Sequence, residues 1–263
     1  VRTHIRYNPL DENQARAQTF ILEQTLLAGD SVCACSVQEI VLESGQSHTA
    51  LDLLRVQQPA LWSPEQPFCY DLETRLIKKA RGKRTVVIDR ERTTVGIREV
   101  VFKGKELFIN GNKTFLRGVN RHQEYPYVGY AAPANAQWRD AEKIREAGFN
   151  LVRLSHYPQS PDFMEACNRL GLFVLDAVPG WQYFSGDPAF QAQVIETARH
   201  MIRRDRNHPC VLAWEVSLNE SWMSEEFIDK ILEASRSEMP VPIYTAGWQE
   251  YGYDIFLQAR QHR

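Results

Sequence analysis

The feature that most constrains the fold is a change in sequence pattern near residue 100. Before it, short segments that alternate in part between apolar and polar residues are separated by Gly, Ser, Pro or charged turns. The strands expected there are 19–26, 31–39, 48–54, 68–78 and 85–97. Because no helical periodicity interrupts them, they predict a small antiparallel sandwich of immunoglobulin-like type, with a domain over residues 1–99.

After residue 100, helical segments alternate with strands. A helix over 137–147 is expected to follow Asn135 as its cap, and Ser160-Pro161 and Asp187-Pro188 each place a capping side chain before a first-turn proline. Ser224, followed by two glutamates, predicts a further helix. The apolar segments between these helices predict strands at 114–120, 149–154, 172–176, 211–216, 243–246 and 253–257.

Strands joined mainly through helices are the arrangement of a parallel (β/α)8 TIM barrel, which needs eight strands. About six are present, so residues 100–263 predict the N-terminal part of such a barrel. The expected fold class is therefore multidomain: an all-β immunoglobulin-like sandwich followed by an incomplete TIM barrel. An open doubly wound sheet is the alternative, but no glycine-rich phosphate turn follows any strand. The unpaired strand edges of an incomplete barrel would favour self-association.

Composition narrows the class of partner. The chain has 263 residues, a net charge of −2 and a pI near 6.4, so it offers no positive field for nucleic acid or for an anionic membrane surface. No apolar run is long enough to cross a bilayer, and no leader sequence opens the chain. A soluble protein is expected, with a cytoplasmic or periplasmic location left open. The five cysteines lie in apolar patterns, which predicts small core residues.

Polar residues follow the expected barrel strands where these strands end. His122 follows the first strand, His156 the second, and Asp176 ends the third; Asn219-Glu220 come after the fourth, and Trp181 lies in the loop after the third. Since reactive side chains of barrels gather at the carboxyl ends of the strands, these residues form the candidate site.

Glu220 is the strongest catalytic candidate. A carboxylic acid after a strand can protonate a departing glycosidic oxygen, although an Asn-Glu pair alone is a weak signal. The two histidines could instead be ordinary hydrogen-bonded residues. They lack the close spacing and third ligand of zinc motifs, so neither a metal site nor a cofactor is predicted. Glu215 faces away from Glu220 by strand alternation, which predicts an internal salt bridge or a polar layer.

Several segments carry a resemblance to glycoside hydrolase family 2, which includes β-galactosidases, β-glucuronidases and β-mannosidases. They are Leu61-Trp62-Ser63-Pro64-Glu65-Gln66-Pro67, Leu116-Arg117-Gly118-Val119-Asn120-Arg121-His122, Asn150-Leu151-Val152-Arg153-Leu154-Ser155-His156-Tyr157-Pro158, and Asp205-Arg206-Asn207-His208-Pro209 through Asn219-Glu220. The motifs occur in the family's order and cover nearly the whole chain.

The resemblance implies a retaining glycosidase that acts on β-linked sugars, with β-galactosides as the first choice. It also implies roles: Glu220 as the acid/base, Asn219 beside the cleavage point, and His122 and His156 lining the sugar subsite. Trp181 would form part of the pocket wall. Asp176 falls where the family usually has two acidic residues, and Ala177 replaces the second of them.

The family's nucleophile is a glutamate at the end of the seventh barrel strand, and no such strand is found before Arg263. The chain alone is therefore expected to be truncated and inactive, with its nucleophile beyond Arg263. A non-catalytic carbohydrate-binding or structural remnant is the alternative from another class. A metal-dependent hydrolase is the third reading.

Overall fold

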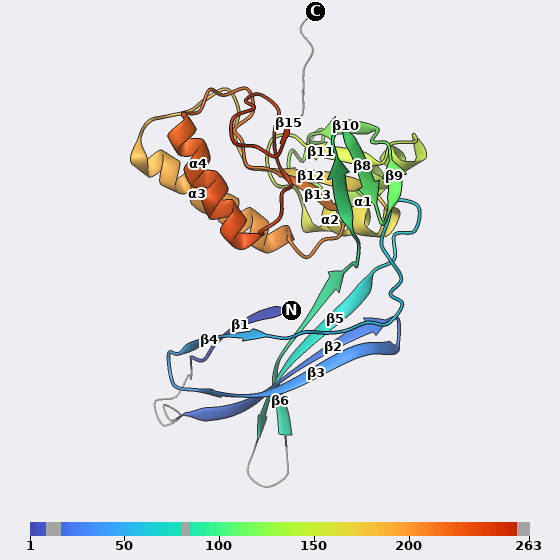
Figure 1. The fold of residues 1–263 in the computed structure, drawn as a ribbon, viewed down its shortest axis with the longest axis vertical. Helices are drawn as coiled ribbons and strands as arrows, with labels where there is room; N and C mark the ends of the chain where they lie inside the picture. The colour runs from blue at the N-terminus through green and yellow to red at the C-terminus, as the bar shows by residue number, and fades with distance from the viewer. Residues whose placement is uncertain (9–16, 80–84, 257–263) are drawn as a thin grey trace, which may run out of the picture. The chain divides into compact units, whose positions relative to one another are not determined.

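The computed structural model describes residues 1–8, 17–79 and 85–256. The chain forms two compact units. The first comprises Val1–Ala60 and Cys69–Val95, and the second comprises Leu61–Phe68 and the chain from Gly96 onward. Figure 1 shows strands alone in the first unit and strands with helices in the second.

The first unit contains two antiparallel sheets. Strands β2 (Gln18–Ala28), β3 (Ser31–Leu42), β5 (Tyr70–Lys79) and β6 (Thr85–Val95) form a sheet in the order β3-β2-β5-β6. The second sheet pairs β1 (Arg2–Arg6) with β4 (Ser47–Leu51). This arrangement confirms the antiparallel β architecture predicted for the N-terminal region. Strand β1 was not predicted, because this short strand alternates exposed with half-buried residues and buries no side chain fully.

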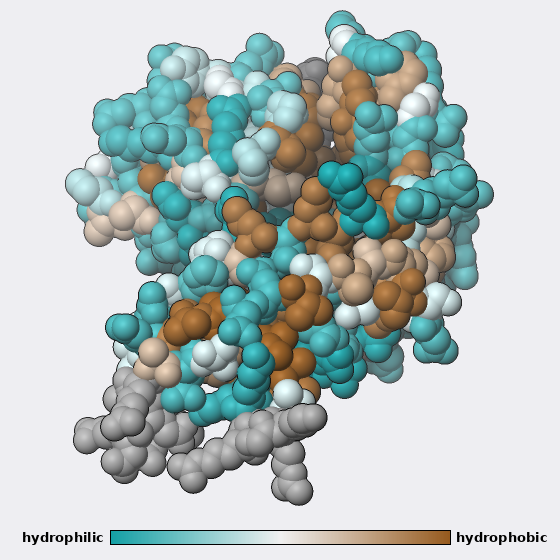
Figure 2. All heavy atoms as spheres, turned by 60° about the horizontal axis from the view of Figure 1, so that its bottom comes forward, coloured by the Kyte–Doolittle hydropathy of each residue, from teal (hydrophilic) through white to brown (hydrophobic). Residues whose placement is uncertain are grey.

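The core of this unit follows from the two-residue period of its strands. Buried Phe20 and Leu22 on β2 alternate with less buried neighbours and pack in one cluster with Ile40, Leu42 and Ala50. Apolar side chains also reach the surface, chiefly on β3 and β6, and Figure 2 shows hydrophobic residues scattered among hydrophilic ones in one view of the molecule. They include Val32, Val37, Val41, Val86, Val87 and Ile88.

The second unit contains a six-stranded parallel sheet. Its strands are β10 (Gly118–Arg121), β11 (Leu151–Leu154), β12 (Phe173–Ala177), β13 (Val211–Glu215), β14 (Tyr244–Ala246) and β15 (Ile255–Phe256). They are neighbours in chain order, and every pairing is parallel. Sequential order is that of a barrel and excludes the doubly wound sheet, whose strand order reverses. The incomplete-barrel prediction is thus confirmed.

Helices connect the first five of these strands (Figure 1). They are α1 (Ala134–Glu146), α2 (Pro161–Leu170), α3 (Pro188–Asp205) and α4 (Glu225–Glu238). Strands β11, β12 and β13 are buried on both faces, as the core of an α/β domain requires. In the described part of the chain, no helix combines the length and the apolar character needed to span a membrane.

The predicted helix starts are confirmed at three of the four helices. Ser160 accepts a hydrogen bond from the Asp162 amide, Asp187 from the Ala189 amide, and Ser224 from the Phe227 amide, so each side chain satisfies a first-turn N–H group. These three side chains cap α2, α3 and α4, respectively. The cap predicted at Asn135 is wrong. Helix α1 begins at Ala134 after Pro133, and no side chain caps it.

Two further expectations need correction. The segment after residue 100 contains a three-stranded antiparallel sheet, which the sequence analysis did not predict; its strands are β7 (Val100–Lys103), β8 (Glu106–Ile109) and β9 (Asn112–Thr114). Such strands are too short to show a clear period. Cys35 is exposed, so it is not a core residue, whereas Cys167 and Cys210 are fully buried.

Candidate active site

The loop after β12 and the segment after β13 run side by side at the carboxyl edge of the parallel sheet. Trp181 and Asn219 form a parallel bridge. The Asn219 amide donates to the Gly180 carbonyl at 3.1 Å, and the Gln182 amide donates to the Asn219 carbonyl at 2.8 Å. These backbone bonds place Glu220, the residue after Asn219, next to the loop that carries Trp181 and Gln182.

Glu220 is half-buried, whereas Asn219 is buried. The Gln182 side-chain amide donates to Glu220 Oε2 at 2.7 Å. Both partners adopt left-handed backbone conformations, with φ of 56° at Gln182 and 50° at Glu220. Residues other than glycine enter this region at an energetic cost, and such positions cluster at functional sites.

Aromatic rings line the edge beside Glu220. The His122 and His156 rings meet edge to face with centroids 5.8 Å apart, and the His156 and Trp181 centroids are 6.2 Å apart. Trp181 remains 48% exposed, which leaves much of its indole surface open to a ligand. The structure therefore brings His122, His156, Trp181 and Asn219 together around Glu220.

The charge state of His156 follows from its surroundings. Burial, with smaller contributions from the nearby Arg153 and His122, lowers the pKa of His156 to about 4, and the Glu220 carboxylate acts in the opposite direction. His156 is therefore neutral near pH 7 and can both donate and accept hydrogen bonds. The carboxylate of Glu220 is close enough to act on this ring.

An ion pair lies beneath Asn219 inside the sheet. Arg153 on β11 donates through Nε to Glu215 Oε2 at 2.7 Å, and its Nη2 donates to both Glu215 Oε1 and Asn219 Oδ1, the latter at 3.1 Å. Arg153 and Glu215 are both buried. The predicted internal salt bridge of Glu215 is confirmed, and it also holds the amide side chain of Asn219.

Asp176 lies apart from this cluster. Its side chain is fully buried, and no side-chain donor of the described residues reaches its carboxyl oxygens. Burial raises the pKa of Asp176 well above its ordinary value, and the neighbouring Asp205 carboxylate raises it further. Asp176 can therefore stay protonated and donate a hydrogen bond to Asp205, which Arg204 binds through two nitrogens. A role in substrate binding stays a prediction for Asp176.

Replacing Asp176 by asparagine should stabilise the protein at pH 7 by about 1–3 kcal/mol, because a neutral amide can donate to Asp205 without any proton uptake. The folded pKa of Asp176 is raised, so the wild-type carboxyl loses stability as the pH rises from about 4. The advantage of the variant should therefore grow with pH. Urea unfolding at several pH values measures it, and an advantage that shrank with pH would contradict this account.

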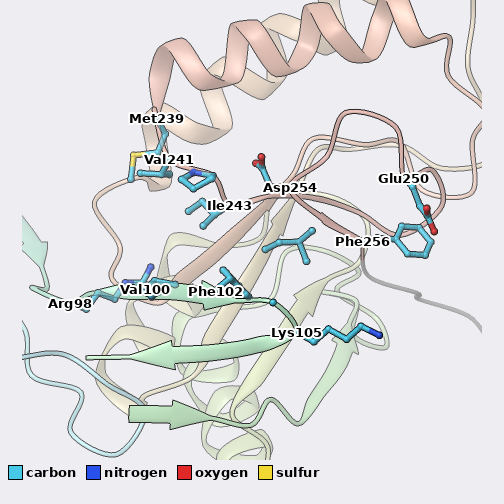
Figure 3. A pocket seen from close by; sticks show the side chains of 14 residues that line it. Arg98, Val100, Phe102, Lys105, Met239, Val241, Ile243, Glu250, Asp254 and Phe256 are labelled. Atoms are coloured by element: carbon cyan, nitrogen blue, oxygen red, sulfur yellow. The ribbon is translucent and has the colours of Figure 1, made fainter. Parts of the chain in front are cut away.

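A second hollow, shown in Figure 3, is lined by residues other than those around Glu220. It is lined mainly by apolar residues of β7, of β15 and of the segment that leads into β14, and Glu250 also borders it. The segment before a strand lies at the amino edge of a parallel sheet, opposite the edge where barrels place catalysis. The Arg98 side chain at this hollow lies over the rings of Trp62 and Phe173, and burial lowers the pKa of Arg98 to about 10.

Two residues of the site carried no role in the sequence analysis, Gln182 and Arg153. Arg153 on β11 and Glu215 on β13 both occupy positions that face the interior of the sheet. Strand alternation could therefore have predicted that the two side chains form a pair. Gln182 gave no such signal, because its loop position has no period. Among the described residues, no group of three or more His, Cys, Asp or Glu side chains has the arrangement of a metal site.

Comparisons with known proteins identify the family of the chain. The family model "Glycosyl hydrolases family 2, TIM barrel domain" matches residues 100–241, and the model "Glycosyl hydrolases family 2" matches residues 7–98. The chain belongs to glycoside hydrolase family 2. Barrels place their active sites at the carboxyl ends of the strands, and this is the edge of the sheet at which Glu220 lies.

Curated relatives in the family include β-galactosidases. The chain is 35% identical over 215 residues to the one from Thermoanaerobacter pseudethanolicus, covering 81% of this chain and 28% of that protein. It is 42% identical over 168 residues to the one from Thermoanaerobacterium thermosulfurigenes, covering 64% of this chain and 22% of that protein. The chain thus spans less than a third of the length of these relatives.

Solved family 2 structures share the fold. A β-glucuronidase of Bacteroides uniformis superposes with a TM-score of 0.80 at 26% identity, covering 93% of this chain and 30% of that one. The structure described as B. uniformis β-glucuronidase 2 covalently bound to cyclophellitol-6-carboxylate aziridine gives 0.79 at 25% identity, covering 93% and 31%. The similarity therefore extends over almost the whole chain.

Proposed function

We propose that this chain supplies the acid/base half of a retaining β-glycosidase, with β-galactosides as substrates. Glu220 protonates the departing glycosidic oxygen in the first step and removes a proton from water in the second. The observation that carries the proposal is the half-buried Glu220 carboxyl at the carboxyl edge of the sheet, beside Asn219, His156 and Trp181.

The neighbours of Glu220 suit a sugar. The open face of Trp181 can stack on the apolar face of a sugar ring, and neutral His156 can bind hydroxyl groups together with His122. Asn219, held by Arg153, would contact the hydroxyl beside the reacting carbon, where hydrogen bonds strengthen in the transition state. The 35% and 42% identities to β-galactosidases favour galactose over glucuronate.

A retaining mechanism also needs a second carboxylate about 5–5.5 Å from the first, to form a covalent sugar–enzyme intermediate. We propose that this nucleophile lies outside the 263 residues of this chain. The related B. uniformis β-glucuronidase 2 is described as covalently bound to a cyclophellitol aziridine, which supports covalent chemistry in the family.

The test is the stereochemistry of hydrolysis by the full-length protein. Proton NMR during cleavage of an aryl β-galactoside should show the β-anomer of galactose first, with the α-anomer appearing only by mutarotation. An aryl β-glucuronide at equal concentration should be cleaved more slowly. The α-anomer as first product would contradict the retaining mechanism, and faster cleavage of the glucuronide would contradict the choice of sugar.

The same assay separates the proposal from the alternative of a carbohydrate-binding or structural remnant. Residues 1–263 alone should bind galactose without turnover if the nucleophile lies elsewhere. Turnover by these residues would contradict their catalytic incompleteness. A full-length protein that binds sugars but cleaves none would favour the remnant. Self-association of the chain through the outer edges of β10 and β15 stays a prediction, which sedimentation can check.

A further inference from the structure

We propose that Gln182 is a positioning residue for Glu220, which fixes the carboxyl in the orientation needed for proton transfer. The role rests on the proposed function, because it matters only if Glu220 is the acid/base. No sequence motif pointed to Gln182. The observation behind it is the 2.7 Å hydrogen bond from the Gln182 side-chain amide to Glu220 Oε2.

The backbone holds the two side chains in register. The Gln182 N–H donates to the Asn219 carbonyl, and the bridge between Trp181 and Asn219 precedes this bond by one residue. Both Gln182 and Glu220 adopt positive φ, so the backbone leaves the extended conformation at each of the two residues. Two strained residues that meet through their side chains indicate a built contact, because strain persists only where the surroundings impose it.

The direction of the hydrogen bond decides what it does. An amide N–H can only donate, so the bonded oxygen, Oε2, acts as an acceptor. The acid proton of Glu220 is then carried by the other oxygen, Oε1, which is the one that must face the leaving group. Gln182 is exposed in the free protein, and its hydrogen bond should strengthen when a sugar excludes water from the site.

The structural half of the test uses residues 1–263 and needs no activity. The side-chain amide signals of Gln182 in ¹H–¹⁵N NMR should shift when Glu220 is replaced by alanine, because the hydrogen-bond acceptor is lost. The matched control is the Gln193 amide on α3, which donates to Thr197 Oγ1 at 3.4 Å and should not respond. An unchanged Gln182 signal would overturn the proposal.

The functional half uses the full-length protein with Gln182→Met, which keeps the side-chain length and removes the donor. We expect kcat/KM to fall about tenfold on glycosides with poor leaving groups, and less than about twofold on activated aryl glycosides, which need little protonation. Gln193→Met is the matched control and should leave both values unchanged. If Gln182 had a merely structural role, its replacement would lower kcat/KM equally for both substrate classes.

The outcomes separate this role from the proposed function. Equal loss on both substrate classes, or no loss, overturns the positioning role while hydrolysis by the wild type still supports the proposed function. A wild-type protein that hydrolyses no β-glycoside overturns the proposed function, and the role of Gln182 falls with it. Selective loss on poor leaving groups together with the shifted amide signal supports the proposal.

Discussion

Replacing Glu220 by glutamine in the full-length protein should lower kcat/KM on glycosides with poor leaving groups by roughly 10²–10⁴-fold, the usual contribution of a general acid or base. Activated aryl glycosides should lose much less in the first step, because their leaving groups depart without a proton. The glutamine keeps the shape of the side chain, so the fold should not change. Initial rates on a series of leaving groups of graded acidity provide the measurement.

The control for this variant is Glu226→Gln, an exposed glutamate in the first turn of α4 that pairs with Lys230. This replacement should leave kcat/KM unchanged for both substrate classes. With Glu220→Gln, added azide should restore turnover of activated substrates, because this anion attacks the covalent intermediate without a general base. Equal loss on all leaving groups would count against Glu220 as the acid.

The second large effect should be on stability. Glu215→Gln should lower the free energy of unfolding by about 3–5 kcal/mol, because it leaves the guanidinium of Arg153 buried without its counter-charge. Asn219 should also lose its fixed orientation, since Arg153 holds both groups. Urea unfolding of residues 1–263, followed by circular dichroism, measures the loss.

A double replacement tests the cause. Arg153→Met together with Glu215→Leu removes both charges, so it should recover most of the stability lost by Glu215→Gln alone. Glu226→Gln breaks an exposed pair with Lys230 and should shift the urea midpoint little, because water already screens that pair. A double variant as unstable as the single one would show that packing, and not the unpaired charge, sets the cost.

Much of the fold could be predicted because its signals are local. The starts of α2, α3 and α4 follow from a capping side chain within three residues, and Gly171 ends α2 in the left-handed conformation that glycine tolerates. The six parallel strands follow from short apolar segments between those helices. The sheet of β7, β8 and β9 escaped prediction, because strands of three or four residues carry no readable period.

Some residues of the candidate site could likewise be predicted from the sequence, whereas the placement of others could not. Glu220, Asn219, His122 and His156 could be selected from the sequence, because the carboxyl ends of barrel strands converge whatever the loops do. Asp176 obeyed the same rule and yet lies buried beside Asp205. A residue inside a strand faces the sheet interior or the helices according to its register, and that register depends on the neighbouring strands.

The sequence by itself therefore determined the order of the elements, the parallel sheet and the edge where the polar residues gather, since capping and hydrophobic period act over a few residues. Only the tertiary structure decided that Gln182 meets Glu220, that Arg153 reaches Asn219 as well as Glu215, and that Asp176 lies next to Asp205. These contacts join residues 29–66 positions apart in the chain. Such pairings arise from strand register and loop path, which no local pattern encodes.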